Sequence, residues 1–103
     1  MTPTQRSLAL LRGQGYTADV VERWIPRANV RKDLFGIFDI IAIRDGETLA
    51  VQCTTTGVAS RCRKIAEAPT IDAVRAAGWG VVVHGWRKVG KPPRWACRVV
   101  DLS

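Results

Sequence analysis

The segment FGIFDIIAIRDGETLAVQCT, residues 35–54, carries the strongest structural signal in the chain. Two apolar runs, residues 35–44 and 47–54, flank Asp45-Gly46, a dipeptide typical of the two-residue turn of a β-hairpin. Both runs carry apolar residues on both faces, apart from a few positions, so each strand is expected to be covered on both faces. The segment therefore predicts a hairpin in the middle of a sheet, with helices on either side.

The turn also predicts which residues of the hairpin face each other. If Asp45 and Gly46 form the loop, Arg44 faces Glu47 and Asp39 faces Gln52, whereas a bulged loop would shift the pairing by one residue. Asp39 and Gln52 are the polar interruptions of their two runs. A buried carboxylate needs a cation or hydrogen-bond donors, so we expect Asp39 to meet Gln52. The alternative is a hydrogen bond that only fixes the strand register.

The rest of the chain predicts helices and strands around this hairpin. On the N-terminal side we expect a helix over 4–12 capped by Thr2 or Thr4, a strand over 16–25 ended by Pro26, and a loop over 27–34. On the C-terminal side we expect helices over 58–68 and 69–78, strands over 79–86 and 95–102, and a basic loop over 87–94. The prediction is one α/β domain over 1–103, with a central mixed sheet flanked by helices in the order α-β-β-β-α-α-β-β.

Composition points to an anionic partner. The 103 residues carry a net charge of +7, and sixteen of them are Lys or Arg. Because arginine, the more frequent of the two, holds phosphate with a planar fork, nucleic acid is the first expectation. No apolar span or lipidation signal points to a membrane. The alternative is that the positive charge only keeps the protein soluble.

The cysteines predict neither disulfides nor a zinc site. There are three, with no CxxC pair and no signal peptide, and the chain has a single histidine. An odd number of widely spaced cysteines is not a disulfide framework, and a structural zinc site needs four ligands. We therefore expect reduced cysteines and a cytoplasmic protein.

The hairpin resembles the PD-(D/E)XK nuclease superfamily, which includes Holliday junction resolvases and many restriction-type enzymes. That family has an acidic residue on one strand and, on the next, an acidic residue or Gln, any residue, then Lys. Residues 36–42 (GIFDIIA) match the first part, and residues 51–54 (VQCT) stand where the second belongs. The resemblance covers roughly residues 16–86 and implies a restriction-endonuclease-like core. Thr54 occupies the position of the family's lysine.

The resemblance implies a site that hydrolyses a phosphodiester with Mg²⁺ or Mn²⁺. Asp39, the Gln52 side-chain oxygen and the Cys53 carbonyl would hold the ion, because hard cations prefer oxygen ligands. Glu22 and Asp33 would supply further carboxylates; alternatively Glu22 pairs with Arg23 or is solvated, and Asp33 is a plain loop charge. Thr54 occupies the lysine position of the motif. Lys64 on the following helix, with Arg61 one turn earlier, is the best candidate for the missing cation, and Lys32 and Lys88 are the others.

Two basic regions are candidates for phosphate contacts. One is the helix after the motif, and the other is the loop between the two last strands, where basic residues lie next to tryptophans that can stack on a base or sugar. The expected contact residues are Lys32, Asp33, Arg61, Arg63, Trp86, Arg87, Lys88 and Lys91. The alternatives are a solvated helix face and tryptophans that belong to the core. We expect the lone histidine, His84, to be structural.

Taken together, the sequence predicts a Mg²⁺-dependent endonuclease acting on DNA, including branched junctions, as a homodimer. A non-catalytic nucleic-acid-binding module that has kept the fold and lost the lysine is the second hypothesis. A basic adaptor for an acidic protein is the third.

Overall fold

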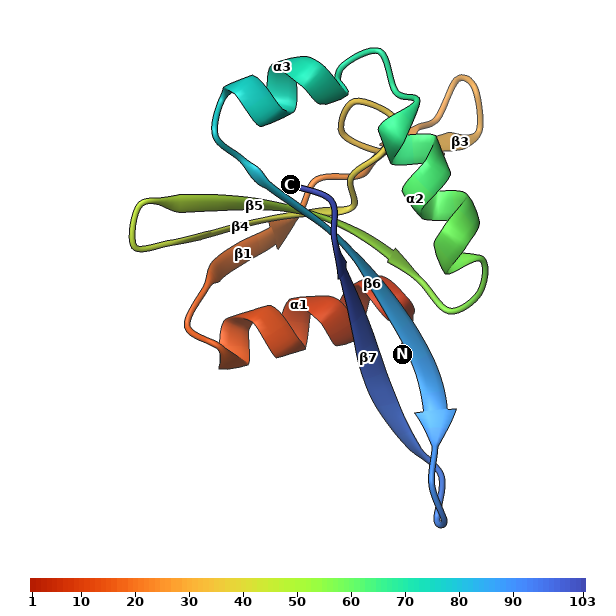
Figure 1. Ribbon diagram of the computed structural model, residues 1–103. Helices are drawn as coiled ribbons and strands as arrows, with labels where there is room; N and C mark the ends of the chain where they lie inside the picture. Colours follow the sequence, from red (N-terminus) through yellow and green to blue (C-terminus); the bar gives the residue numbers. More distant parts are fainter.

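The computed structural model describes residues 1–103 as one α/β unit. The chain begins with helix α1 (Pro3–Gly13), strand β1 (Thr17–Val20), and the short strands β2 (Arg23–Ile25) and β3 (Val30–Lys32). The central hairpin, β4 (Ile40–Arg44) and β5 (Glu47–Thr54), follows. Helices α2 (Val58–Ala66) and α3 (Ile71–Ala76) and strands β6 (Gly80–Val89) and β7 (Arg94–Asp101) complete it (Figure 1).

Five strands form a mixed sheet in the order β1-β4-β5-β6-β7, as the sequence predicts in outline. β5 and β6 are parallel, and every other neighbouring pair is antiparallel. The parallel pair is joined through α2 and α3, as a crossover connection requires. The hairpin register is confirmed, because Arg44 pairs with Glu47 and Ile40 with Val51 around the Asp45-Gly46 turn.

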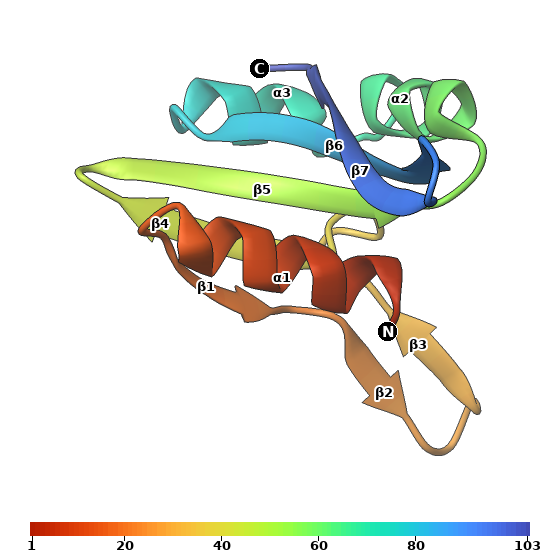
Figure 2. The ribbon, with the colours of Figure 1, turned by 90° about the horizontal axis from the view of Figure 1, so that it is seen from below.

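The sheet is covered on both faces, as the apolar hairpin strands predict. α1 lies on one face, and α2 and α3 lie on the other (Figure 2). Under α1 the core includes Leu11, Ile40 and Val51, and under α2 and α3 it includes Phe38 and Ile65. Alternate residues of β4, β5 and β6 serve the two cores, because successive side chains of a strand point to opposite faces.

Helix α1 starts with a capping box at the predicted cap Thr2. The Thr2 side chain accepts a hydrogen bond from the Gln5 N–H at 3.1 Å, and the Gln5 side chain accepts one from the Thr2 N–H at 2.9 Å. The hydroxyl of Ser7, one turn further, is buried against β6 and lies 2.9 Å from Nδ1 of His84. Burial lowers the pKa of His84 to about 4, so His84 is a neutral core residue, in keeping with a structural role.

The predicted extents of several elements are wrong. The strand expected over 16–25 breaks at Val21 and Glu22 into β1 and β2, and the loop expected over 27–34 contains β3. Residues 35–38 form a turn closed by a bridge between Leu34 and Phe38, so only the second half of the expected strand over 35–44 is β4. Half of the expected basic loop over 87–94 is strand, because β6 extends to Val89 and β7 begins at Arg94.

The extended β6 and β7 form a long arm that projects from the body (Figure 1). Their pairing continues out to Val89 and Arg94, leaving a short connection at the tip. Beyond Trp86 the arm is mostly exposed. Separately, none of the helices has the length and apolar character needed to cross a membrane.

Candidate metal centre and nucleic-acid interface

The β2–β3 hairpin brings together two acidic residues that are eleven positions apart in the sequence. Arg23 at the start of β2 pairs with Lys32 at the end of β3, so Glu22 and Asp33 are the next residues on the two chains at the base of the hairpin. The N–H of Val21 donates to the carbonyl of Asp39 at 2.8 Å and joins this base to the start of β4. One side-chain oxygen from each of Glu22, Asp33 and Asp39 lies within 4.8 Å of the other two.

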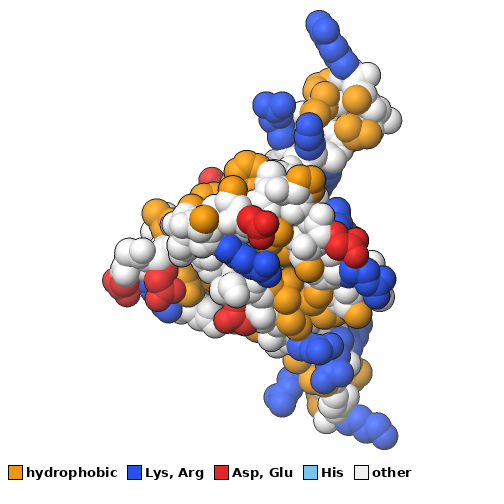
Figure 3. Space-filling model, turned by 45° about the horizontal axis from the view of Figure 1, so that its top comes forward, with side chains coloured by type: hydrophobic (Ala, Val, Ile, Leu, Met, Phe, Trp, Pro, Cys, Tyr) orange, Lys and Arg blue, Asp and Glu red, His pale blue; other side chains and the backbone are white.

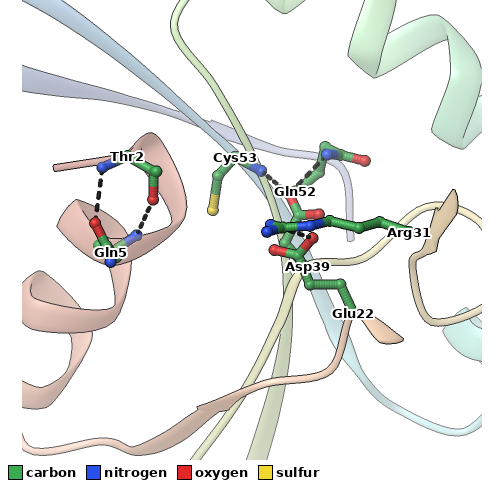
Figure 4. Close-up of polar contacts among 7 residues, drawn as sticks. All are labelled: Thr2, Gln5, Glu22, Arg31, Asp39, Gln52 and Cys53. Carbon is green, nitrogen blue, oxygen red and sulfur yellow. Dashed lines mark hydrogen bonds and ion pairs between the residues drawn. The ribbon is translucent and has the colours of Figure 1, made fainter. Parts of the chain in front are cut away.

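Asp39 is held in place by the neighbouring strand. It lies in the bend just before β4 rather than within the strand. Its Oδ2 accepts hydrogen bonds from Nε2 of Gln52 and from the N–H of Cys53, both at 2.8 Å (Figure 4). The predicted meeting of Asp39 and Gln52 is therefore confirmed. Both residues are buried, at 6% and 2% exposed, so the carboxylate has little freedom to move.

The acidic surroundings make the negative charge of Asp39 unfavourable. The pKa of Asp39 is raised to about 7, chiefly by burial, with the neighbouring carboxyls of Asp33 and Glu22 adding to the rise and the Cys53 N–H opposing it. Like charges close together in a poorly solvated place cannot all be ionised cheaply. A bound cation would remove this repulsion, and three carboxylates are a donor set suited to a hard divalent ion.

The predicted ligand set of Asp39, Gln52 and the Cys53 carbonyl differs from the one that the geometry offers. The Gln52 amide presents Nε2, a donor, to Asp39, while its Oε1 is buried without a hydrogen-bond partner. Cys53 contributes its N–H to Asp39. Gln52 and Cys53 thus position the carboxylate of Asp39, which forms with Glu22 and Asp33 a group of three carboxylates that could hold an ion.

The cation nearest the cluster is Arg31, which sequence reasoning missed as a site residue. Its Nη1 lies 3.7 Å from Oε2 of Glu22, a member of the cluster (Figure 4). The Arg31 side chain is 72% exposed, so the pair is solvated and the guanidinium is free to take another anion. No sequence pattern predicts the position of Arg31, because it depends on the pairing of β2 with β3, which was not predicted.

The Thr54 side chain stabilises the end of β5. Its hydroxyl donates to the carbonyl of Thr56 in the turn that leads to α2. The proposed replacement cation, Lys64, is exposed on α2 and forms no ion pair, and Arg63 is likewise exposed and unpaired. Arg61 on the same helix is half-buried. Neither Thr54 nor Lys64 therefore forms a hydrogen bond or ion pair with the carboxylates.

Four of the expected nucleic-acid contacts lie on two projecting parts of the molecule, whereas Arg61 and Arg63 lie on α2. Lys32 lies on the β2–β3 hairpin, and Arg87, Lys88 and Lys91 lie on the β6–β7 arm, all exposed. Figure 3 shows Lys and Arg side chains at both projections, with the body between them. Asp33, at the base of the β2–β3 hairpin, belongs instead to the carboxylate cluster.

Trp86 is a correction among the expected contacts. It is 8% exposed, and its Nε1 donates to Oγ of Ser7 at 2.8 Å, so it is a core residue and offers no open face. Trp95 is the accessible tryptophan of the arm, lying under the guanidinium of Arg6 at 4.1 Å and the ammonium of Lys88 at 5.4 Å. Stacked cations on Trp95 concentrate positive charge at the root of the arm.

Comparison of the chain with protein-family models, curated proteins and solved structures found no match. The functional argument therefore rests on the residues and their geometry.

Proposed function

We propose that the chain is a divalent-cation-dependent nuclease acting on DNA, with the restriction-endonuclease-like core of PD-(D/E)XK enzymes. The observation that carries the proposal is the meeting of three carboxylates, from three separate segments, at the base of a basic hairpin. The order of three antiparallel strands, a helical crossover and a parallel strand supports the core assignment. The net charge of +7 supports a polyanionic substrate.

The donor set fits Mg²⁺ or Mn²⁺. Three carboxylates provide hard oxygen ligands, and a divalent cation would offset the repulsion among them. When bound, such an ion supplies a water of lowered pKa and neutralises charge developing on the phosphate.

The chain's own residues orient the reacting groups. Gln52 and the Cys53 N–H fix the Asp39 carboxylate, so the site is rigid before substrate arrives. The exposed Arg31 guanidinium can donate two parallel hydrogen bonds to phosphate oxygens, which a lysine cannot do. We therefore assign to Arg31 the role of holding the phosphate, in a site whose motif lysine is replaced by Thr54.

We extend the proposal to branched DNA cut by a homodimer. One chain measures 42 × 37 × 24 Å, which allows it to lie along one side of a duplex. A two-fold arrangement of two chains would place two sites on a two-fold junction.

Cleavage of a supercoiled plasmid and of a four-way junction, with Mg²⁺ or Mn²⁺, tests the proposal. We expect metal-dependent nicking or strand cleavage that falls by at least about a hundredfold in Asp39→Asn. Glu47→Gln removes an exposed carboxylate at the far end of the β4–β5 hairpin and serves as the matched control. Metal-dependent cleavage that is the same in both variants would refute the assignment of the site.

A non-catalytic nucleic-acid-binding module is the second candidate. It is favoured by Thr54, whose hydroxyl is already used in a turn, so that no lysine enters the site from this strand. This function predicts salt-sensitive DNA binding without cleavage under any divalent ion.

A further inference from the structure

A small apolar hollow lies beside the carboxylate cluster and has no role in the proposed chemistry. Its volume is about 160 Å³, and it opens between α3 and the turn that precedes Asp39. Its lining is apolar except for one threonine and comprises Phe35, Thr70, Ala73, Val74, Ala77 and Trp79. A hollow of this size is smaller than a typical drug-sized site and suits one flat ring system.

The backbone holds Phe35 in an unusual way. Phe35 has a φ of 56°, in the left-handed region that bulky residues rarely adopt. Its side chain is half exposed, at 50%, and its ring is tilted by 41° to that of Trp79 with 6.3 Å between centroids. A strained turn that holds an aromatic ring open to solvent is an arrangement more typical of a binding site than of a core.

The one polar residue of the hollow has an unused hydrogen-bonding group. Oγ1 of Thr70 is buried and has no hydrogen-bond partner. Thr70 stands at the N-cap of α3, where a threonine side chain usually accepts from the helix, but it makes no such bond. A buried hydroxyl without a partner is destabilising, so a ligand that reaches it gains a hydrogen bond that the free protein lacks.

Phe35 lines this hollow and also a second hollow that has charged residues in its lining. The second hollow, of about 250 Å³, is lined by Phe35 together with Arg23, Lys32 and the cluster residue Asp33. A ligand that fills both hollows therefore has a flat apolar part with a polar edge, covalently joined to an anionic group that lies near two cations and the carboxylates. A nucleotide within a nucleic-acid strand has this construction.

We propose that the hollow lined by Phe35 and Trp79 receives an unpaired nucleobase of the DNA strand whose phosphate lies at the carboxylate cluster. This inference rests on the proposed function and narrows its substrate to DNA with an unstacked base beside the scissile bond. The base packs against the Phe35 and Trp79 rings, since every base has a π-face that stacks on aromatic side chains.

Binding without metal tests the inference separately from catalysis. The two probes are a labelled duplex with one unpaired central adenine and the same duplex with an abasic site there, titrated in EDTA by fluorescence anisotropy. We expect the wild type to bind the adenine probe about tenfold more tightly than the abasic probe. We expect Phe35→Ala to abolish this preference, and Ala77→Leu, which fills the hollow and keeps Phe35, to abolish it too.

Trp24→Ala is the matched control, because Trp24 is an equally exposed aromatic on β2 that does not line the hollow. It should keep the preference. Equal affinity of the wild type for the two probes overturns the inference, as does a preference that survives both Phe35→Ala and Ala77→Leu. A change of sedimentation coefficient in Phe35→Ala, with no preference in the wild type, would assign the hollow to contact between copies. None of these results alters the metal-dependent cleavage that tests the proposed function.

Discussion

Ionised Asp39 lowers the stability of the folded, metal-free protein. It is buried, it lies with Glu22 and Asp33, and its pKa is raised from 3.8 to about 7. A carboxylate with a raised folded-state pKa lowers the stability of the metal-free protein as pH rises through that interval. Functional sites often retain unfavourable charges of this kind, because a substrate or metal later compensates them.

In EDTA at pH 8, Asp39→Asn should raise the free energy of unfolding by about 1–3 kcal/mol. The amide oxygen can still accept from Gln52 and from the Cys53 N–H, while the repulsion from the neighbouring carboxylates is lost. Urea unfolding of the wild type and the variant measures the difference. Glu47→Gln, an exposed change of the same charge, should stay within about 0.5 kcal/mol of the wild type.

The stability difference should grow between pH 4 and pH 7 and then level off, because over that range Asp39 is ionised in the unfolded wild type but still protonated in the folded one. The pKa of His84 is lowered to about 4, so His84 gives the opposite trend, with stability lost as pH falls from 6.5. It is present in both proteins, so the difference between them isolates Asp39. An Asp39→Asn variant less stable than the wild type at pH 8 would contradict this account.

Among the site residues, the sequence predicts that Asp39 meets Gln52 but does not predict that Glu22 and Asp33 meet. The meeting of Asp39 with Gln52 follows from a single turn dipeptide, because a two-residue loop fixes the register of both strands. The approach of Glu22, Asp33 and Arg31 depends on the hairpin of β2 and β3. Glu22 and Asp33 were expected to be further carboxylates from the resemblance, but the residues between them predicted no pairing.

The buried strands were predicted from the sequence better than the exposed ones. β4, β5 and β6 carry apolar runs that the core requires, and their presence and order were predicted. β2 and β3 are almost wholly exposed, so no period of apolar residues marks them. The first half of the strand expected over 35–44 is not a strand, because Phe35 and Gly36 have positive φ. Side-chain hydrophobicity does not reveal this backbone conformation. The two strands of the arm were predicted too short at its tip, because the basic residues there are typical of a loop.

Close packing of α2 on β6 gives a prediction for Gly85. A Cβ on Gly85 would come within 2.5 Å of Cγ2 of Val58, the first residue of α2. Gly85→Ala should therefore destabilise the protein by about 1–3 kcal/mol, because the helix must move from the sheet. Gly13→Ala, in α1 with nothing within 4 Å of its Cβ, should be neutral or slightly stabilising. Thermal unfolding compares the two, and equal melting temperatures would show that this contact is not tight.

For the molecule as a whole, positive charge is unevenly placed. It lies at the β2–β3 hairpin and at the β6–β7 arm, the two projections seen in Figure 3, while the carboxylate cluster lies at the base of the first. The composition predicted an anionic partner but not this distribution, because charge content alone does not place residues in space. Under the proposed function, a nucleic acid that contacts both projections extends from the base of the β2–β3 hairpin to the arm.

The arm should therefore contribute to affinity and not to chemistry. Arg87, Lys91 and Arg94 are exposed and make no ion pair, so replacing all three with Gln leaves the fold intact. If each neutralises one phosphate, the slope of log K against log salt concentration should fall by about 2–3. A second variant, with Arg61, Arg63 and Lys64 of α2 replaced by Gln, loses the same total charge. Comparing the two variants separates the effect of where the charges lie from the effect of net charge. Cleavage at saturating DNA should be unchanged in the arm variant. Equal slopes in the two triple variants would mean that net charge, and not the arm, determines binding.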